Sequence, residues 1–316
     1  MENISEGSKS LLKEIGNTPL VKIKTGDYAA NANIYAKYEA LNPGGSIKSR
    51  TAYWMIKQAI KRGDIDEDTV LLEASSGNQG IGLSLIGAIM GLKVKIIMPE
   101  SMSKERRLLI RAYGAEVILS PVYEDIGKTI ESARTIARNM AKEDDNIYWV
   151  RQFTNHDNSD AHRLFTSQEI IAQVPEAIDV FITGIGTGGT ITGIGEVLKE
   201  EYPDCKVVAV EPEKAAFLQG GFLGHHIQEG IGDGVVPEIL NTDIIDDFVT
   251  VSDKQALETS QKLASNEGLF VGISSGSNIY AANQIAKKYS DIKSIVTVLP
   301  DSGDRYFSSD LLEKLS

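Results

Sequence analysis

The sequence predicts an α/β protein of two lobes, each a mostly parallel, twisted sheet flanked by helices. Short apolar runs alternate with longer amphipathic or apolar stretches, and glycine, serine and threonine fill many of the intervening loops. This alternation is typical of strands joined by crossover helices. A chain of 316 residues with 42% hydrophobic content can build two such lobes. We expect an N-terminal lobe of residues 1–150 and a C-terminal lobe of residues 151–316, although the first strands could pack on the second lobe.

The expected elements follow from period-two and helical spacing of apolar residues, interrupted by proline and glycine. Strands are expected at residues 33–39, 68–73, 93–99, 116–119, 177–182, 204–210, 247–251 and 294–299. Helices are expected at residues 47–62, 81–90, 103–113, 129–141, 190–198, 253–265 and 279–288. Residues 213–237 have no such pattern and are expected to form a long loop.

Composition excludes several classes of function. The net charge of −12 argues against nucleic-acid binding, which needs clustered Lys and Arg. No apolar run approaches membrane-spanning length, and the start of the chain lacks the basic-then-apolar order of a signal peptide. We therefore expect a cytoplasmic protein. Cys205 is the single cysteine and the four histidines match no recognised zinc spacing, so we expect no disulfide and no metal site.

Lys48 is the first candidate catalytic residue, because it follows a strand and the turn 43–45 and lies in the first turn of a helix that Ser46 would cap. The free N–H groups of a helix start disfavour a cation, which pushes the amine toward its neutral form. A neutral, desolvated lysine is suited to Schiff-base chemistry with a carbonyl. An ordinary surface lysine fits this segment alone equally well.

Two further strand-to-helix loops offer anion sites. The loop 74–80 carries hydroxyls and an amide at a helix start, a combination suited to a carboxylate, although a plain polar turn is an alternative. The glycine- and threonine-rich loop 183–190 suits a phosphate. Its spacing also satisfies the dinucleotide fingerprint, with Glu211 about twenty residues later. A nicotinamide-dependent dehydrogenase is therefore a remote alternative.

The segments Ile15–Leu20 and Asn42–Arg50, the five positions 186–190, and Pro300–Tyr306 resemble the cysteine synthase and cystathionine β-synthase family. The resemblance runs over nearly the whole chain. It implies a pyridoxal-phosphate (PLP) enzyme of fold type II, the tryptophan-synthase-β type, with an active site between two lobes. It also implies a homodimer, and it leaves open whether serine acetyltransferase binds.

The resemblance assigns roles to individual residues. Lys48 would hold PLP, Asn78 would touch its phenolic oxygen, and Ser274 would contact the pyridine nitrogen. The phosphate would lie on Gly186, Thr187, Gly188, Gly189 and Thr190. The substrate carboxylate would contact Ser75, Ser76, Gln79 and Gln152.

The implied reaction is replacement or elimination at Cβ of a serine- or cysteine-type amino acid through an aminoacrylate. O-acetylserine and sulfide would give cysteine. Gln79 departs from the threonine of most relatives, and Asp233 stands where many cysteine synthases have a small apolar residue. Asp233 could act as a general base or could be an exposed turn residue. The alternative reactions are sulfide release from cysteine and synthesis of lanthionine or cystathionine, with cysteine or serine as the amino-acid substrate and a thiol or water as the nucleophile.

Overall fold

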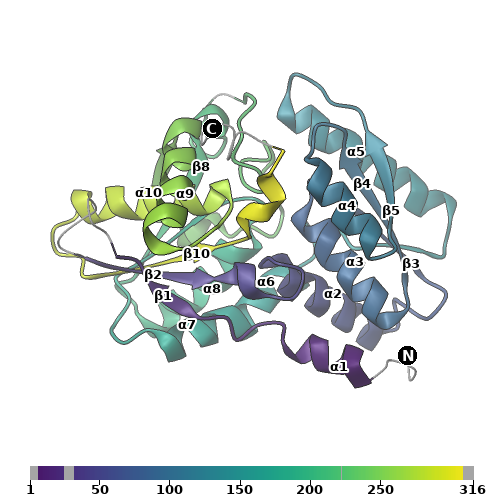
Figure 1. The fold of residues 1–316 in the computed structure, drawn as a ribbon, viewed down its shortest axis with the longest axis horizontal. Coiled ribbons are helices and arrows are strands. Elements are labelled where there is room, and N and C mark those ends of the chain that lie inside the picture. The colour runs from purple at the N-terminus through teal and green to yellow at the C-terminus, as the bar shows by residue number, and fades with distance from the viewer. Residues whose placement is uncertain (1–5, 25–31, 222, 309–316) are drawn as a thin grey trace.

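Two separate sheets organise the molecule, and each is enclosed by its own helices (Figure 1). The computed structural model describes residues 6–24, 32–221 and 223–308. Within these ranges the strands pair in parallel, apart from one antiparallel pair in the larger sheet. The α/β prediction of two mostly parallel sheets flanked by helices is confirmed.

The smaller sheet has the strand order β5-β4-β3-β6, and all of its pairs are parallel. Its strands are β3 (Val70–Ala74), β4 (Lys93–Pro99), β5 (Glu116–Ser120) and β6 (Ile147–Trp149). Its helices are α2 (Lys48–Arg62), α3 (Asn78–Met90), α4 (Lys104–Ala112) and α5 (Ile126–Glu143). Helix α5 covers one face, where Ala133 and Ala137 pack on Leu72. The other face carries α2, α3 and α4.

The larger sheet has the strand order β1-β2-β10-β7-β8-β9. Its strands are β1 (Leu20–Lys22), β2 (Asn33–Tyr38), β7 (Val180–Gly184), β8 (Lys206–Pro212), β9 (Asp247–Val251) and β10 (Ser294–Leu299). Strand β2 pairs in parallel with β10, with Asn33 opposite Ser294. The first two strands, β1 and β2, therefore belong to the sheet of the second lobe, and the chain then crosses over to build the first lobe. The lobe boundary at residue 150 stays a prediction.

The helices of the second lobe cover both faces of its sheet. They are α6 (Asp157–Ala161), the π-helical turn η2 (His162–Thr166), α7 (Ser167–Gln173), α8 (Gly189–Glu201), α9 (Asp253–Glu267) and α10 (Ile273–Lys288). Strand β7 shows why both faces must be covered, because Val180 and Ile182 enter the core beneath α9 and α10 while Phe181 enters the core beneath α8. A parallel strand of this kind is apolar on both sides.

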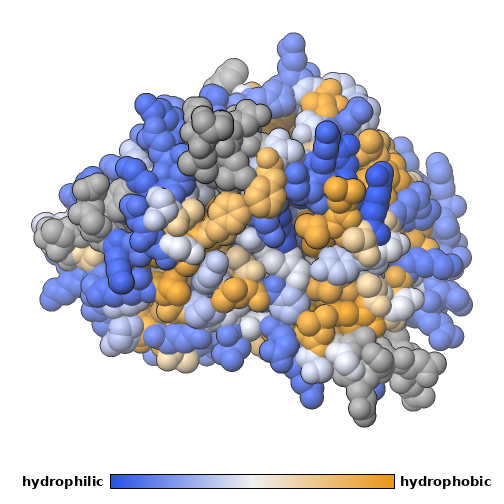
Figure 2. Space-filling view, viewed as in Figure 1, coloured by the Kyte–Doolittle hydropathy of each residue, from blue (hydrophilic) through white to orange (hydrophobic). Residues whose placement is uncertain are grey.

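Short elements complete the described chain. They are α1 (Glu6–Lys13) and the 3-10 turns η1 (Glu39–Leu41), η3 (Glu213–Ala215), η4 (Thr242–Ile244) and η5 (Gly303–Tyr306). In the view of Figure 2, hydrophilic side chains cover much of the outer edge of both lobes, and hydrophobic ones gather nearer the middle. No helix in the described ranges is long and apolar enough to cross a membrane.

The predicted cap of α2 is wrong by one residue. Ile47 is the N-cap of α2, although Ser46 Oγ still accepts a hydrogen bond from the Lys48 N–H at 3.3 Å. Helix α9 is capped by Ser252, whose hydroxyl forms a capping box with Gln255, so Asp253 is the first helical residue. In both cases a serine hydroxyl serves the first turn, because it is short enough to reach the free N–H groups.

Candidate active site

A pocket between the two lobes collects every predicted site residue except Gly189. Its predicted members come from both sheets: Lys48, Ser75, Ser76, Asn78, Gln79, Gln152, Gly186, Thr187, Gly188, Thr190, Asp233 and Ser274. Most of these residues follow the carboxyl ends of β2, β3, β7 and β8. Ligands of parallel α/β sheets bind at those ends. Gly189 lies just behind, as the first residue of α8.

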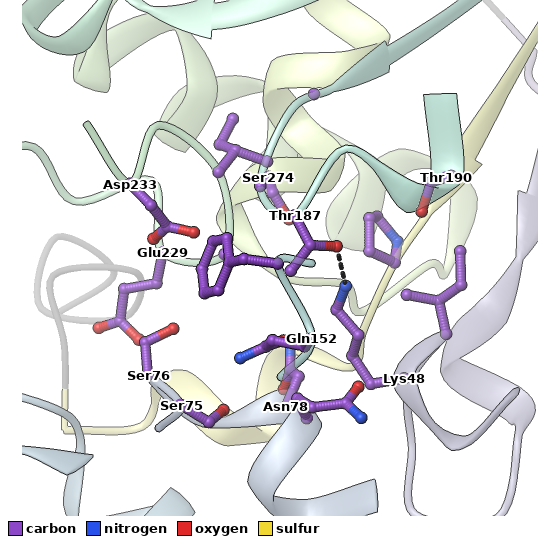
Figure 3. Close-up of a pocket in the computed structure, with 18 of the residues that line it drawn as sticks. Lys48, Ser75, Ser76, Asn78, Gln152, Thr187, Thr190, Glu229, Asp233 and Ser274 are labelled. Carbon is purple, nitrogen blue, oxygen red and sulfur yellow. Dashed lines mark hydrogen bonds between the residues drawn. The ribbon is translucent and has the colours of Figure 1, made fainter. Parts of the chain in front are cut away.

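The turn before α2 aims Lys48 into this pocket (Figure 3). Gly44 and Gly45 have φ angles of +79° and +70°, values that L side chains rarely adopt. Lys48 is then the first residue of α2. Its Nζ lies 3.5 Å from the Thr187 hydroxyl of the opposite lobe. The amine therefore faces the glycine-rich loop and not bulk water.

Burial lowers the pKa of Lys48 to about 8, and the negative charge of Asp233 partly opposes this shift. The sequence argument expected the same direction from the helix start. The main cause is removal of the amine from water. The side chain is half-buried along its length, but its amine lies inside the pocket. A substantial fraction of neutral amine near pH 8 suits it to attack an aldehyde.

In the loop after β3, Ser75 stabilises the loop through hydrogen bonds and Ser76 lines the pocket. Ser75 Oγ accepts hydrogen bonds from the N–H groups of Gly77 and Gly80, both at 3.1 Å. These bonds hold the start of α3, and the Ser75 hydroxyl keeps its own hydrogen to donate. Ser76 lies on the pocket wall on the same side as Glu229 and Asp233 (Figure 3).

Gln79 and Gln152 are both buried in the pocket wall, at 2% and 5% exposure. Gln79 Oε1 accepts from the Thr51 hydroxyl at 2.8 Å, while its Nε2 has no partner among the described residues. Gln152 Nε2 donates to the Ala74 carbonyl at 2.9 Å. The Gln79 N–H groups are therefore available to an acceptor on a ligand in the pocket.

Asn78 is held by two residues that sequence reasoning did not single out. Its Nδ2 donates to Asp301 Oδ2 at 2.7 Å, and Arg305 donates to its Oδ1. Arg305 also donates to the Gly44 carbonyl, next to the Lys48 turn. The sequence indicates the segment 300–306 only as a motif, and its role in orienting Asn78 follows from the fold.

The glycine-rich loop fits a phosphate group. Gly188 has a φ of +80° and precedes α8. A Cβ at Gly186 would come within 2.3 Å of the Gly230 carbonyl, and one at Gly189 within 2.3 Å of Asn158 Oδ1. Glycine is therefore required, and the bare backbone leaves N–H donors at the start of α8 beside Thr187. These uncharged donors match the phosphate of PLP.

Comparisons with known proteins agree with this site. The family model described as pyridoxal-phosphate dependent enzyme matches residues 11–301. The chain belongs to this family. It is 44% identical to a cysteine synthase of Staphylococcus aureus, over 94% of both chains.

Two solved structures resemble this PLP-dependent enzyme closely. The O-acetylserine dependent cystathionine β-synthase from Helicobacter pylori has a TM-score of 0.90 and 36% identity, covering 95% of this chain and 97% of its own. A hydrogen sulfide-producing enzyme from Fusobacterium nucleatum has a TM-score of 0.89 and 39% identity, covering 94% and 99%. The resemblance inferred from the motifs is confirmed.

The family match leaves no support for the nicotinamide alternative. Glu211, the acid of the dinucleotide fingerprint, accepts from the Leu218 N–H at 2.9 Å and from Gln219 Nε2 at 3.2 Å. Its carboxylate therefore holds its own loop and does not line the pocket between the lobes. Among the described residues, no group of three or more His, Cys, Asp or Glu could hold a metal ion.

The loop after β8 brings two carboxylates to the pocket of this PLP enzyme. Burial raises the pKa of Asp233, and the charges of His226 and Lys48 oppose that rise. Asp233 lines the pocket (Figure 3) and is partly buried, so it is not an exposed turn residue. Glu229, which sequence reasoning missed, forms an ion pair with Arg106 of the other lobe. The position of Glu229 at the pocket depends on its pairing with Arg106, which is far away in the sequence.

Ser274 lies inside a helix that was expected to begin later. Helix α10 starts at Ile273, so Ser274 occupies its first turn and is 3% exposed. The apolar spacing in this segment is weak, because residues 274–278 are small or polar. The first turn packs closely on α9, since a Cβ at Gly276 would lie 2.0 Å from the Ala256 carbonyl, and this packing supplies the stability that the local pattern lacks.

Proposed function

We propose that this chain catalyses replacement or elimination at Cβ of a serine- or cysteine-type amino acid, with O-acetylserine and sulfide giving cysteine as the principal reaction. The observation that carries the proposal is the Lys48 amine, with a pKa of about 8, 3.5 Å from Thr187 of the phosphate loop. Bound PLP supplies an electron sink that acidifies the Cα proton and allows a Cβ leaving group to depart.

The chain's own residues divide the remaining work. The backbone N–H groups of the loop 186–190, with the Thr187 and Thr190 hydroxyls, bind the phosphate. Asn78 and Ser274 orient the ring, and an uncharged serine does not enforce a protonated ring nitrogen. This favours elimination at Cβ over transamination. The Lys48 amine would hold the cofactor and would take the proton from the substrate Cα.

The substrate carboxylate lies against the start of α3. Ser75, Ser76, Gln79 and Gln152 donate to it, and the free N–H groups of the helix start add to their attraction. The unpaired Nε2 of Gln79 supports this placement. These donors fix the amino acid so that its Cα lies within reach of Lys48.

A second candidate reaction uses an organic thiol or water as nucleophile, or releases sulfide from cysteine. It is favoured by a hollow that adjoins the main pocket and shares Ser76, Glu229 and Asp233 with it. Met102 and Ile227 also line this hollow. Asp233 would take the proton of the incoming nucleophile there, and an acceptor larger than sulfide would have room.

The test of the proposed function has two parts. The purified protein should bind PLP with a visible absorption band, and Lys48→Ala should abolish that band. The enzyme should then be assayed for cysteine formation from O-acetylserine and sulfide, and in parallel for sulfide release from cysteine alone or with homocysteine. A colourless protein that does not bind added PLP would refute the proposal. Faster sulfide release than cysteine formation would favour the second reaction.

We also propose a homodimer. Leu164 and Phe165 are 50% and 42% exposed on η2, and Phe165 packs edge-on against Trp54 with ring centroids 4.9 Å apart. Exposed apolar side chains grouped in this way are typical of an interface. Phe165→Glu should convert a dimer to monomer in analytical ultracentrifugation. A cytoplasmic location and binding of serine acetyltransferase stay predictions from the sequence.

A further inference from the structure

Asn158, on the short helix α6, lies directly behind the phosphate loop. Its side chain is 1% exposed. Its Nδ2 donates to the Gln152 carbonyl at 2.7 Å and to the Thr187 hydroxyl at 3.0 Å. Both amide hydrogens are therefore used. One buried side chain thus joins the strand end that carries Gln152 to the loop that carries Thr187.

The orientation of the Asn158 amide follows from its partners. The Gln152 carbonyl can only accept, so an amide turned the other way would place two acceptors face to face. The NH₂ group must therefore point at Gln152 and Thr187. Thr187 Oγ1 consequently accepts from Asn158, and its single hydrogen must point elsewhere. The pocket, with Lys48 Nζ at 3.5 Å, lies on that other side.

Close packing keeps Asn158 in place. A Cβ at Gly189 would lie 2.3 Å from Asn158 Oδ1, and one at Gly193 would lie 2.2 Å from the Ser159 carbonyl. Helix α6 thus packs directly on the bare backbone of α8. Asn158 Oδ1 has no hydrogen-bond partner among the described residues. The hydrogen bonds of Asn158 are thus confined to its donor end.

We propose that Asn158 is a positioning residue that fixes the Thr187 hydroxyl as a hydrogen donor toward the pocket. The Thr187 hydroxyl is then one of the donors that the phosphate loop presents to its anion. His162, one turn further along, lies 3.3 Å from Thr190 Oγ1 through its Nε2. The same segment therefore supports both threonines. The inference rests on the proposed function only in naming the anion as the phosphate of PLP.

Asn158→Asp tests this directly, because aspartate has the same shape but replaces the donor by an acceptor. The Thr187 hydroxyl would then donate to the new carboxylate, and its hydrogen would no longer point toward the pocket. The affinity of the cofactor-free protein for PLP should fall about 10- to 100-fold, as expected for one hydrogen bond to a charged group. The midpoint of Lys48 reactivity against pH, measured with an amine-selective reagent on cofactor-free protein, should rise, because a nearby anion favours the charged amine.

Asn283→Asp is the matched control. Asn283 is also a 1% exposed asparagine on a helix, but it lies nine residues beyond Ser274, roughly 13 Å along α10. The Asn283→Asp variant should match the wild type in its affinity for PLP and in the pH midpoint of Lys48 reactivity. Equal PLP affinities and equal Lys48 midpoints in Asn158→Asp and Asn283→Asp would overturn the inference. A wild-type protein that binds no PLP would instead refute the proposed function.

A double-mutant cycle keeps the test valid if Asn158→Asp does not fold. Asn158→Ala should weaken PLP binding in the wild type but have no further effect in Thr187→Val, because the hydroxyl it directs is gone. If the losses of PLP affinity in Asn158→Ala and Thr187→Val instead add up in the double variant, the inference is overturned.

Discussion

Lys48 and Asp233 come from opposite lobes and influence each other's protonation inside one pocket. Burial lowers the pKa of the lysine and raises the pKa of the aspartate, and the attraction between their charges opposes both shifts. The structure therefore couples the residue proposed to hold the cofactor to the residue proposed to activate the nucleophile. A change at either should be visible at the other.

Asp233→Asn should lower the pKa of Lys48 further below 8, since it removes the charge that stabilises the ammonium. In the cofactor-free protein, the rate of PLP capture should rise with pH and level off above about 8 for the wild type. The variant should level off at lower pH. Turnover with a thiol acceptor should fall about 10²-fold or more if the carboxylate is a general base. Unchanged turnover would exclude that role.

The same shift has a consequence for stability. The folded pKa of Lys48, about 8, is below its ordinary value of 10.5. Between these values the unfolded chain binds more protons, so the contribution of Lys48 to the free energy of unfolding should increase as pH rises from 8 to 10.5. Urea titrations of cofactor-free wild type and Lys48→Met across this range would measure it, and a difference independent of pH would contradict it.

Gln79→Met should weaken binding of the amino-acid donor while leaving PLP content unchanged. The substitution keeps the length of the side chain but removes the unpaired Nε2. Loss of a hydrogen bond to a carboxylate should raise the KM for the donor by about 10- to 100-fold. Gln79→Thr restores a donor and should recover part of this loss. A KM unaltered in Gln79→Met would mean that Gln79 only fills space.

The ion pair between Arg106 and Glu229 crosses the two lobes beside the pocket. Arg106 also stacks on Tyr306 at 4.6 Å from the ring centroid. Glu229→Gln should leave the buried Arg106 with a weaker partner and make the loop 213–237 easier to cleave by protease. Glu131→Gln, which alters exposed pairs on α5, is the control and should cost less than about 1 kcal/mol. Equal protease resistance in both variants would contradict this role.

Arg50 should be important for stability. It is 4% exposed and donates to Glu39 at 2.6 and 2.9 Å and to Glu169 at 2.6 and 2.7 Å. Arg50→Met would leave Glu39, which is fully buried, without its cation. The free energy of unfolding should fall by about 3–5 kcal/mol, the usual cost of breaking a buried pair. A loss below about 1 kcal/mol in urea titration would contradict this role for Arg50.

The same cluster predicts sensitivity to acid. Bonds from Arg50 and Lys37 outweigh burial and lower the pKa of Glu169 from 4.5 to about 2. Because the folded pKa is depressed, this stabilisation should be complete above 4.5 and be lost as pH falls toward 2. Glu169→Gln should remove that part of the pH dependence.

Much of the candidate site could be predicted from short segments. The strand, glycine turn and helix start around Lys48 place a lysine at a helix N-terminus, and the loop 186–190 needs only its glycines and threonines to indicate an anion site. Both are local features, since they depend on backbone angles and neighbours within a few residues. The start of α10 was missed because its first turn is polar and is stabilised by packing.

Spacing over a few residues is enough to predict the alternation of strands and helices, the two anion loops and the residues that line them. Three properties depend on the fold: how far burial lowers the pKa of Lys48, which side chains orient Asn78 and Thr187, and the pairing of Glu229 with Arg106. Those properties arise between residues up to 227 positions apart. Their physical cause is the removal of charges and amides from water, and only the folded chain defines which groups then meet.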